Sequence, residues 1–135
     1  ARALSASVAT IARHPDAAAR VAADRDYAER AVLEALRLDP PTTTIVRVAS
    51  ARDELPSGTV VPPRAKLLVS PYLLHRDPGL HPDPERFDPG RFDYEARRER
   101  PPYAYIPFGA GPRTCIARNL ALMAATLVVR RAFRA

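Results

Sequence analysis

Apolar residues recur at helical spacing near the start of the chain. Three helices are predicted there, over residues 1–13, 15–23 and 27–38. Leu4, Val8 and Ile11 share one face of the first helix, and Pro15 suits the first turn of the second. The Pro-Pro pair at 40–41 ends the third helix, because a proline disfavours helical backbone in the residue before it.

Alternating, β-branched residues follow and predict a small amount of sheet. Short strands are expected over residues 43–49, 59–61 and 65–69. Ser70 and Pro71 form an N-cap and first-turn pair, so a short helix should run from there to about His75. Several helices with a few short strands predict a mainly α fold with small β-sheet segments, of the α+β class.

Prolines and glycines interrupt the chain over residues 76–92, where regular structure cannot extend far. Apolar side chains in this segment, such as Phe87, still need packing partners, so we expect it to be ordered but irregular. One helical turn is predicted over 93–100 and a long helix over 116–132. The buried face of the long helix is expected to comprise Ile116, Leu120, Met123, Ala124, Leu127 and Val128.

The chain is basic, with a net charge of +6 and a pI near 10.2 that come almost entirely from arginine. A basic surface favours nucleic acid, an anionic membrane or an acidic protein as its partner. Nucleic-acid modules interleave exposed aromatic side chains with basic ones, whereas the aromatic residues here cluster with prolines. We therefore expect no nucleic-acid binding, and we expect most of the arginines to form a solvated surface.

The length of 135 residues and the hydrophobic content of 47% are those of one globular domain. The first predicted helix has no capping residue and the chain opens on Ala1, so we expect it to be part of a longer protein. No apolar run reaches the roughly 20 residues of a membrane span. The single cysteine excludes an internal disulfide and fits the reducing cytoplasm, which is the expected location.

That cysteine, Cys115, lies in a glycine loop directly before the last predicted helix. Gly109 and Gly111 have no side chain and leave room for a large planar cofactor. The start of the helix offers free N–H groups and positive potential to a negatively charged ligand. Arg113 can hold an anionic group on the cofactor rim, such as a propionate. These features predict a metal site with Cys115 as the ligand.

A lone cysteine at a helix start is more often a small buried hydrophobic residue. Here, however, the segment fits the pattern F-x-x-G-x-R-x-C-x-[GA] and resembles the haem-binding loop of the cytochrome P-450 family, the haem-thiolate monooxygenases. The matching residues are Phe108, Gly111, Arg113, Cys115 and Ala117. The resemblance implies that Cys115 is the axial iron ligand of haem b (iron protoporphyrin IX). It also implies cofactor contacts from Arg113, Phe108, Gly109, Gly111 and Ala117.

Glu34 and Arg37 are separated by one helical turn and share a helix face. Most such pairs are exposed and contribute a few tenths of a kcal/mol, but the apolar neighbours of this pair indicate burial. In the family that the chain resembles, this E-x-x-R pair is completed by an arginine from an F-x-P-x-R-F segment, which residues 87–92 match. The resemblance implies a structural network with Arg91, not Arg86, as third member. It would lock the irregular segment onto the third helix and position the Cys115 loop.

Two further residues have candidate roles. Arg47 lies among β-branched residues, where an arginine is ordinarily outward-facing. The family has a propionate-binding arginine on the matching strand, so the resemblance implies that Arg47 acts with Arg113. His75 has no second ligand at metal spacing, and we expect it to pack or to hydrogen-bond rather than to bind metal.

The resemblance implies that residues 1–135 are a single partial domain, the C-terminal part of a haem-thiolate monooxygenase. The parent enzyme would activate O₂ at the haem and insert one oxygen atom into an apolar small-molecule substrate. A ferredoxin or flavin reductase would donate electrons at a basic face near Cys115. No catalytic residue beyond the haem ligand is expected in this stretch, and the isolated fragment should be inactive.

Two alternatives remain open. The chain can be a non-catalytic or degenerate haem-binding remnant of the same family, with the same fold and no turnover. It can also be an arginine-rich nucleic-acid module, which predicts salt-dependent binding and no haem absorbance.

Overall fold

Helices account for most of the regular structure in residues 1–134, the part of the chain that the computed structural model describes. In chain order the elements are α1 (Arg2–Ala12), α2 (Pro15–Ala23), α3 (Arg25–Leu38), β1 (Ile45–Val48), β2 (Asp53–Glu54), β3 (Val60–Val61), β4 (Lys66–Val69), α4 (Pro71–Leu74), the 3₁₀ turn η1 (Pro89–Phe92), α5 (Tyr94–Glu99), the 3₁₀ turn η2 (Gly111–Arg113) and α6 (Arg118–Ala132). The predicted mainly α fold with small sheets is confirmed.

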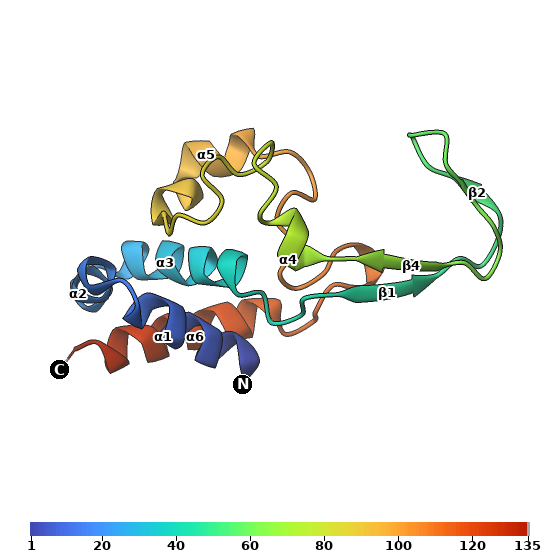
Figure 1. The fold of residues 1–135 in the computed structure, drawn as a ribbon. Coiled ribbons are helices and arrows are strands. Elements are labelled where there is room, and N and C mark those ends of the chain that lie inside the picture. The colour runs from blue at the N-terminus through green and yellow to red at the C-terminus, as the bar shows by residue number, and fades with distance from the viewer. Residues whose placement is uncertain (135) are drawn as a thin grey trace.

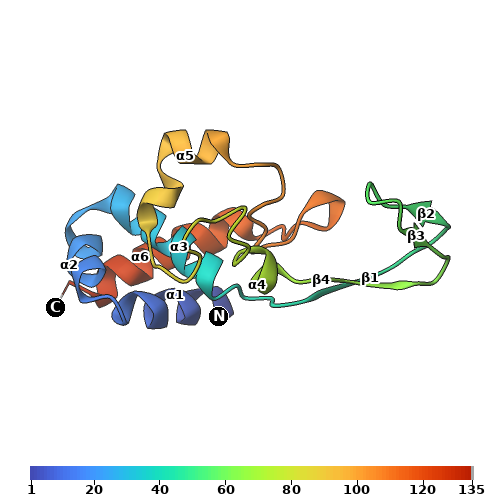
Figure 2. The same ribbon diagram turned by 45° about the horizontal axis from the view of Figure 1, so that its top comes forward.

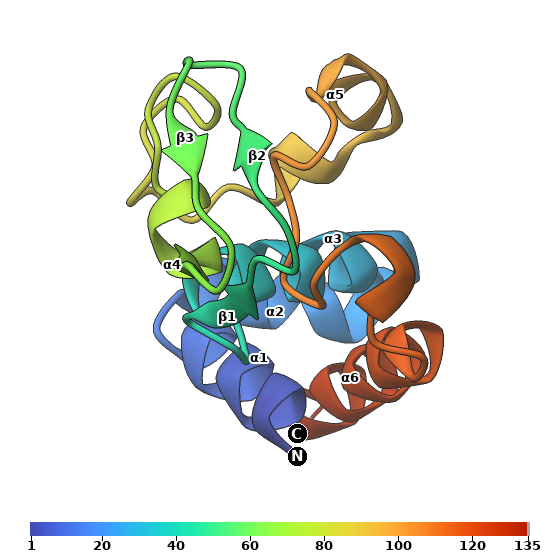
Figure 3. The same cartoon turned by 90° about the vertical axis from the view of Figure 1, so that its right-hand side faces the viewer.

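Helices α1, α3 and α6 contact one another and enclose the core. In Figure 1, α3 runs in the direction opposite to α1 and α6, and Figure 3 shows the three helices nearly end-on. Small and branched side chains predominate between them, which allows the helices to approach closely. The buried cluster consists of Ile11, Ala17, Val21, Tyr27, Ala28, Ala31, Val32, Ala35, Leu36, Ala125 and Val129.

Asp24 determines where α3 begins. Its carboxylate accepts hydrogen bonds from the backbone N–H groups of Asp26 and Tyr27, at 2.8 and 3.0 Å. The bond from Tyr27 is the main cause of a lowered pKa at Asp24, and the bond from Asp26 adds to it. The helix therefore starts at Arg25, two residues before the predicted start.

The sheets are two antiparallel pairs. Strand β1 pairs with β4 in a register that places Ile45 opposite Val69 and Val48 opposite Lys66, and β2 pairs with β3. Figure 2 shows the β1–β4 ribbon projecting away from the helices toward the β2–β3 pair. Strand β2 was not predicted, because its two residues, Asp53 and Glu54, are acidic types that are depleted in strands.

The buried face predicted for the last helix is wrong. Leu120 is 63% exposed and Leu127 59% exposed, whereas Ala125 and Val129 are wholly buried against the core. Apolar residues surround α6 on nearly every side, so their spacing does not identify the inward face. The exposed apolar residues of this stretch are Ile116, Leu120, Met123, Leu127 and Val128.

Within residues 1–134, no helix combines the length and the apolar character needed to cross a bilayer.

Candidate functional site

Cys115 lies at the end of a loop that leads from the buried Ile106 to α6. Its thiol is free and the residue is exposed. The backbone N–H of Cys115 donates to the carbonyl of Phe108 at 3.0 Å, and that of Thr114 donates to Gly111 at 3.0 Å. These bonds close the loop on itself, so that the position of the cysteine depends on the position of Phe108.

Gly109 and Gly111 shape the loop. Their φ angles are +76° and +71°, a backbone conformation that is costly for residues with a side chain. A Cβ at Gly111 would meet no atom within 4 Å, and one at Gly109 would lie 3.9 Å from the carbonyl oxygen of Arg113 and 4.0 Å from the side chain of Ile45 in β1. The space beside Gly111 is therefore open, and the thiol of Cys115 in the same loop is exposed. This arrangement fits a large planar metal cofactor.

The helix after Cys115 begins later than predicted. Residues 116–117 form a turn, and α6 starts at Arg118 with Ala117 as its exposed N-cap residue. The N–H of Arg118 donates to the carbonyl of Cys115 at 3.2 Å. The cysteine is thus fixed by backbone hydrogen bonds on both sides, rather than by a place in the first helical turn.

Within residues 1–134, no side-chain hydrogen bond or ion pair joins Phe108, Arg113 and Arg47, the remaining candidate cofactor residues. Phe108 is half-buried and packs against the helical core. Arg113 is exposed, and so is Arg47, whose guanidinium donates to the carbonyl of Val46 at 3.0 Å. Neither arginine forms an ion pair with a carboxylate of residues 1–134, so both charges face solvent.

Glu34 and Arg37 form a wholly buried, bidentate ion pair. Arg37 Nε lies 2.8 Å from Glu34 Oε2, and Nη2 lies 2.9 Å from Oε1, with both side chains 0% exposed. Further bonds offset the desolvation of these charges. Arg37 also donates to the carbonyls of His75 at 2.7 Å and Arg86 at 3.2 Å, and Glu34 accepts from the N–H of Asp88 at 2.9 Å.

The structure brings Arg91 to the same pair. Its Nε lies 3.5 Å from Glu34 Oε1, a distance of ionic attraction that is too long for a good hydrogen bond. Its Nη2 donates to the carbonyl of Asp83 at 2.9 Å. Arg86 contributes only its carbonyl to this network. The irregular segment of residues 83–91 is therefore tied to α3 through side chains that are almost fully buried.

His75 is a further member of the network, and its ring is 0% exposed. Nε2 accepts from the N–H of Ile106 at 2.9 Å, so the proton is on Nδ1, which donates to the carbonyl of Arg37 at 3.2 Å. Burial lowers the pKa of His75 to about 4, which keeps the ring neutral. Among residues 1–134 there is no cluster of three metal-ligating side chains, and His75 forms hydrogen bonds.

Sequence reasoning missed two more residues that hold the segment before the Cys115 loop. The Tyr105 hydroxyl donates to the carbonyl of Leu33 at 2.8 Å, and His81 Nε2 donates to that of Ala104 at 3.0 Å. Burial raises the pKa of Tyr105 and lowers that of His81. A signal for Tyr105 exists in its proline-flanked aromatic stretch, but its partner lies 72 residues away in sequence.

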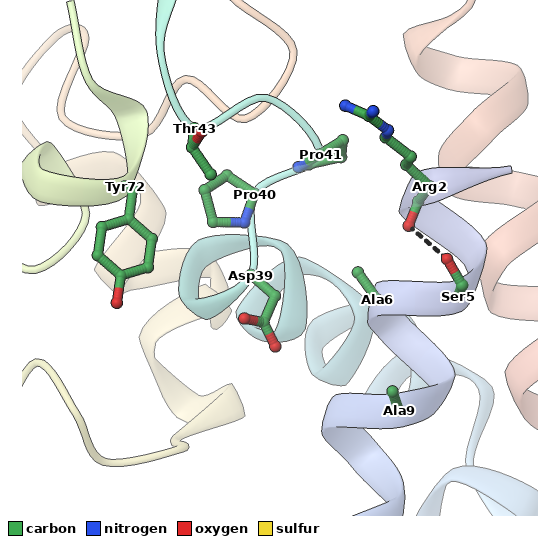
Figure 4. A pocket seen from close by; sticks show the side chains of 9 residues that line it. All are labelled: Arg2, Ser5, Ala6, Ala9, Asp39, Pro40, Pro41, Thr43 and Tyr72. Carbon is green, nitrogen blue, oxygen red and sulfur yellow. Dashed lines mark hydrogen bonds between the residues drawn. The ribbon is translucent and has the colours of Figure 1, made fainter.

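A pocket of about 410 Å³ lies elsewhere, between the start of α1 and the segment after α3 (Figure 4). Ala6, Asp39, Thr43 and Tyr72 are among its lining residues, and none of residues 108–117 lines it. It is therefore separate from the cysteine loop.

A family model described as Cytochrome P450 matches residues 3–135. Cytochrome P450 3A40 of Oryzias latipes is 43% identical over 106 residues, which cover 78% of this chain and 21% of that protein. Cyclooctatin synthase of Streptomyces melanosporofaciens is 43% identical over 103 residues, or 76% of this chain and 22% of that protein.

A solved structure is similar over almost the whole chain. The crystal structure of CYP175A1 from Thermus thermophilus matches with a TM-score of 0.84 and 39% sequence identity. The match covers 98% of this chain and 33% of that one. The chain thus spans about a fifth of the length of the two curated relatives and a third of the solved structure.

Proposed function

This chain belongs to the cytochrome P450 family, and from that premise we propose that it supplies the cysteine-bearing part of a haem-thiolate monooxygenase. The observation that carries the proposal is the exposed Cys115 in a loop that Gly109 and Gly111 shape with positive φ angles, with open space beside Gly111. A single exposed thiol in such a loop would hold the metal of a planar macrocycle as its protein ligand. The proposed cofactor is haem b.

Each residue of the loop would have a simple task. Cys115 would bind the iron, and the two backbone hydrogen bonds beside it would hold the sulfur in place. Gly109 and Gly111 would let the backbone approach the cofactor face. When bound, the haem would supply oxygen activation, which a thiolate ligand favours by donating electron density to iron.

The two solvent-facing arginines would bind the cofactor rim. Arg113 and Arg47 carry charges that no carboxylate of residues 1–134 neutralises. A guanidinium is suited to a propionate because it donates two parallel hydrogen bonds to one carboxylate. Arg113→Ala and Arg47→Ala should each weaken haem retention in the holoprotein, and retention unchanged in both would remove this assignment.

The substrate and electron donor follow from the same proposal. We propose that the parent enzyme inserts one oxygen atom into an apolar small molecule. An acidic ferredoxin or flavin reductase would dock on the basic surface near the Cys115 loop, where Arg118 is exposed, since the chain carries a net charge of +6. Electron transfer should therefore slow as ionic strength rises.

We propose the cytoplasm as the location of the parent enzyme.

The test is the optical spectrum of the reduced carbon monoxide complex of the gene product that contains these residues. The wild-type protein should give the Soret band of a thiolate-ligated haem. Cys115→Ser should lose that band, whereas Thr114→Ser, which keeps the neighbouring hydroxyl, should retain it. A thiolate-type band in Cys115→Ser would refute the proposal.

Turnover distinguishes the two haem-binding alternatives. A thiolate-type spectrum together with substrate-dependent oxygenation supports a monooxygenase. The same spectrum without product, across a panel of apolar substrates and electron donors, would support a non-catalytic haem-binding protein instead.

A further inference from the structure

The buried side chain of His75 joins two parts of the molecule that are far apart in sequence. One ring nitrogen donates to the carbonyl of Arg37 near the end of α3, and the other accepts from the N–H of Ile106. These two hydrogen bonds together require the neutral tautomer of His75 that carries its proton on Nδ1. The lowered pKa that burial gives His75 is consistent with that tautomer at neutral pH.

A short series of backbone bonds continues from Ile106 to the cysteine. The carbonyl of Ile106 accepts from the N–H of Gly109 at 3.0 Å. The carbonyl of Phe108, between these two residues, accepts from the N–H of Cys115 at 3.0 Å. A shift of Ile106 would therefore displace the carbonyl to which the cysteine backbone is bonded.

Other anchors hold the neighbouring residues but do not replace this link. Tyr105 is bonded to Leu33, and Ala104 to His81. Tyr105 and Ala104 precede Ile106 in the chain, and in both bonds the acceptor is a backbone carbonyl. Among residues 1–134, His75 is the side chain that bonds both the Arg37 backbone and the N–H that leads into the cysteine loop.

We propose that His75 is a positioning residue for the thiolate ligand, and that it acts by accepting the hydrogen bond of Ile106 N–H. This inference rests on the proposed haem-thiolate function. It assigns no contact between His75 and the cofactor. The acceptor Nε2 of His75 positions the Cys115 loop, whereas the donor Nδ1 mainly stabilises the fold.

Two substitutions separate the two ring nitrogens. In His75→Gln, the side-chain carbonyl oxygen is as many bonds from Cβ as Nε2 and can accept from Ile106. In His75→Asn, the amide nitrogen corresponds to Nδ1 and can donate to Arg37, but nothing accepts from Ile106. His14→Asn serves as the matched control, because His14 stacks on Phe87 outside this series of bonds.

The experiment records the reduced carbon monoxide spectrum and the melting temperature of the four holoproteins. His75→Asn should raise the ratio of non-thiolate to thiolate haem about fivefold over wild type, the change expected for one neutral hydrogen bond. His75→Gln and His14→Asn should keep the wild-type ratio. Equal ratios in His75→Asn and His75→Gln, whatever their melting temperatures, would overturn the inference.

A purely structural role would lower the melting temperature of both His75 variants without separating their spectra. Absence of a thiolate band in the wild-type protein would instead contradict the proposed function itself. If neither His75 variant folds, amide hydrogen exchange in the wild-type protein tests whether His75 positions the loop. Ile106, Gly109 and Cys115 should exchange together and more slowly than Gly111, and fast exchange at Ile106 would overturn the inference.

Discussion

Arg37 and His75 exchange hydrogen bonds across 38 residues of sequence. The guanidinium of Arg37 donates to the carbonyl of His75 at 2.7 Å, and the ring of His75 donates to the carbonyl of Arg37 at 3.2 Å. Each residue thus satisfies a buried carbonyl of the other. Since unpaired polar groups are costly in the interior, removing either side chain leaves a buried carbonyl of the other residue without its donor.

Arg37→Lys should be strongly destabilising although it preserves charge. The guanidinium bonds both carboxylate oxygens of Glu34 and the carbonyls of His75 and Arg86. A lysine ammonium lacks the planar fork that reaches all four acceptors. We expect a loss of about 2 kcal/mol or more in the free energy of unfolding by urea. An unchanged midpoint and slope would show that the network does not stabilise the fold.

Glu34→Ala should have a larger effect, because it leaves the buried Arg37 and its neighbour Arg91 without their carboxylate. Removing one member of a buried ion pair costs about 3–5 kcal/mol. Glu85→Ala is the control, since Glu85 is 72% exposed in its pair with Arg76 and should cost less than about 1 kcal/mol. Equal melting temperatures for the two variants would contradict the account of the network.

Acid should destabilise the protein through His75 before most carboxylates titrate. Its pKa is lowered from 6.5 to about 4 on folding, so below pH 6.5 the unfolded chain binds a proton that the folded protein excludes. The full contribution of neutral His75 is present above pH 6.5, falls with pH, and is lost below pH 4. Between pH 7 and 5 the decrease should be about 2 kcal/mol.

Urea unfolding of wild type and His75→Gln at pH 7 and 5 measures this contribution. The variant should lose less stability over that interval, because it carries no ionisable group at the site. The lowered pKa of His81 adds to the decrease in both proteins and cancels in the comparison. The same decrease in both would show that His75 is not the group responsible.

The apolar outer face of α6 should make residues 1–135 self-associate when they are expressed alone. Leu120, Met123 and Leu127 lie exposed on this helix, and contiguous exposed apolar surface favours association. Leu120→Gln with Leu127→Gln should convert the chain to a monomer in sedimentation velocity. Leu73→Gln, at an equally exposed position on α4, should not. A monomeric wild-type chain at all concentrations would contradict this prediction.

Local signals in the sequence predicted the helices well, because caps and prolines mark where α2, α3 and α4 begin or end. The grouping of Glu34, Arg37 and Arg91 came from a resemblance, and the structure does place these residues together. The inward face of α6 could not be predicted, since the helix is apolar nearly all round and only its contact with α1 and α3 selects a side.

The two hydrogen-bond partners of His75 could not be predicted either. Its two partners lie 38 and 31 residues away, and neither is a side chain, so no pattern of residue types records the contact. The late start of α6 was missed for a related reason. Ile116 and Ala117 are compatible with a helix, and the bond from Cys115 N–H to Phe108 takes the chain into a turn instead.

The sulfur of Cys115 is the proposed protein ligand of haem iron. X-ray absorption at the iron edge of the haem-loaded gene product detects a sulfur ligand, and Cys115 and Met123 carry the sulfur atoms that residues 1–135 can offer. We expect one sulfur neighbour of iron in wild type and in Met123→Leu, and none in Cys115→Ser. A sulfur neighbour that persists in Cys115→Ser, or its absence from wild type, would show that Cys115 is not the ligand.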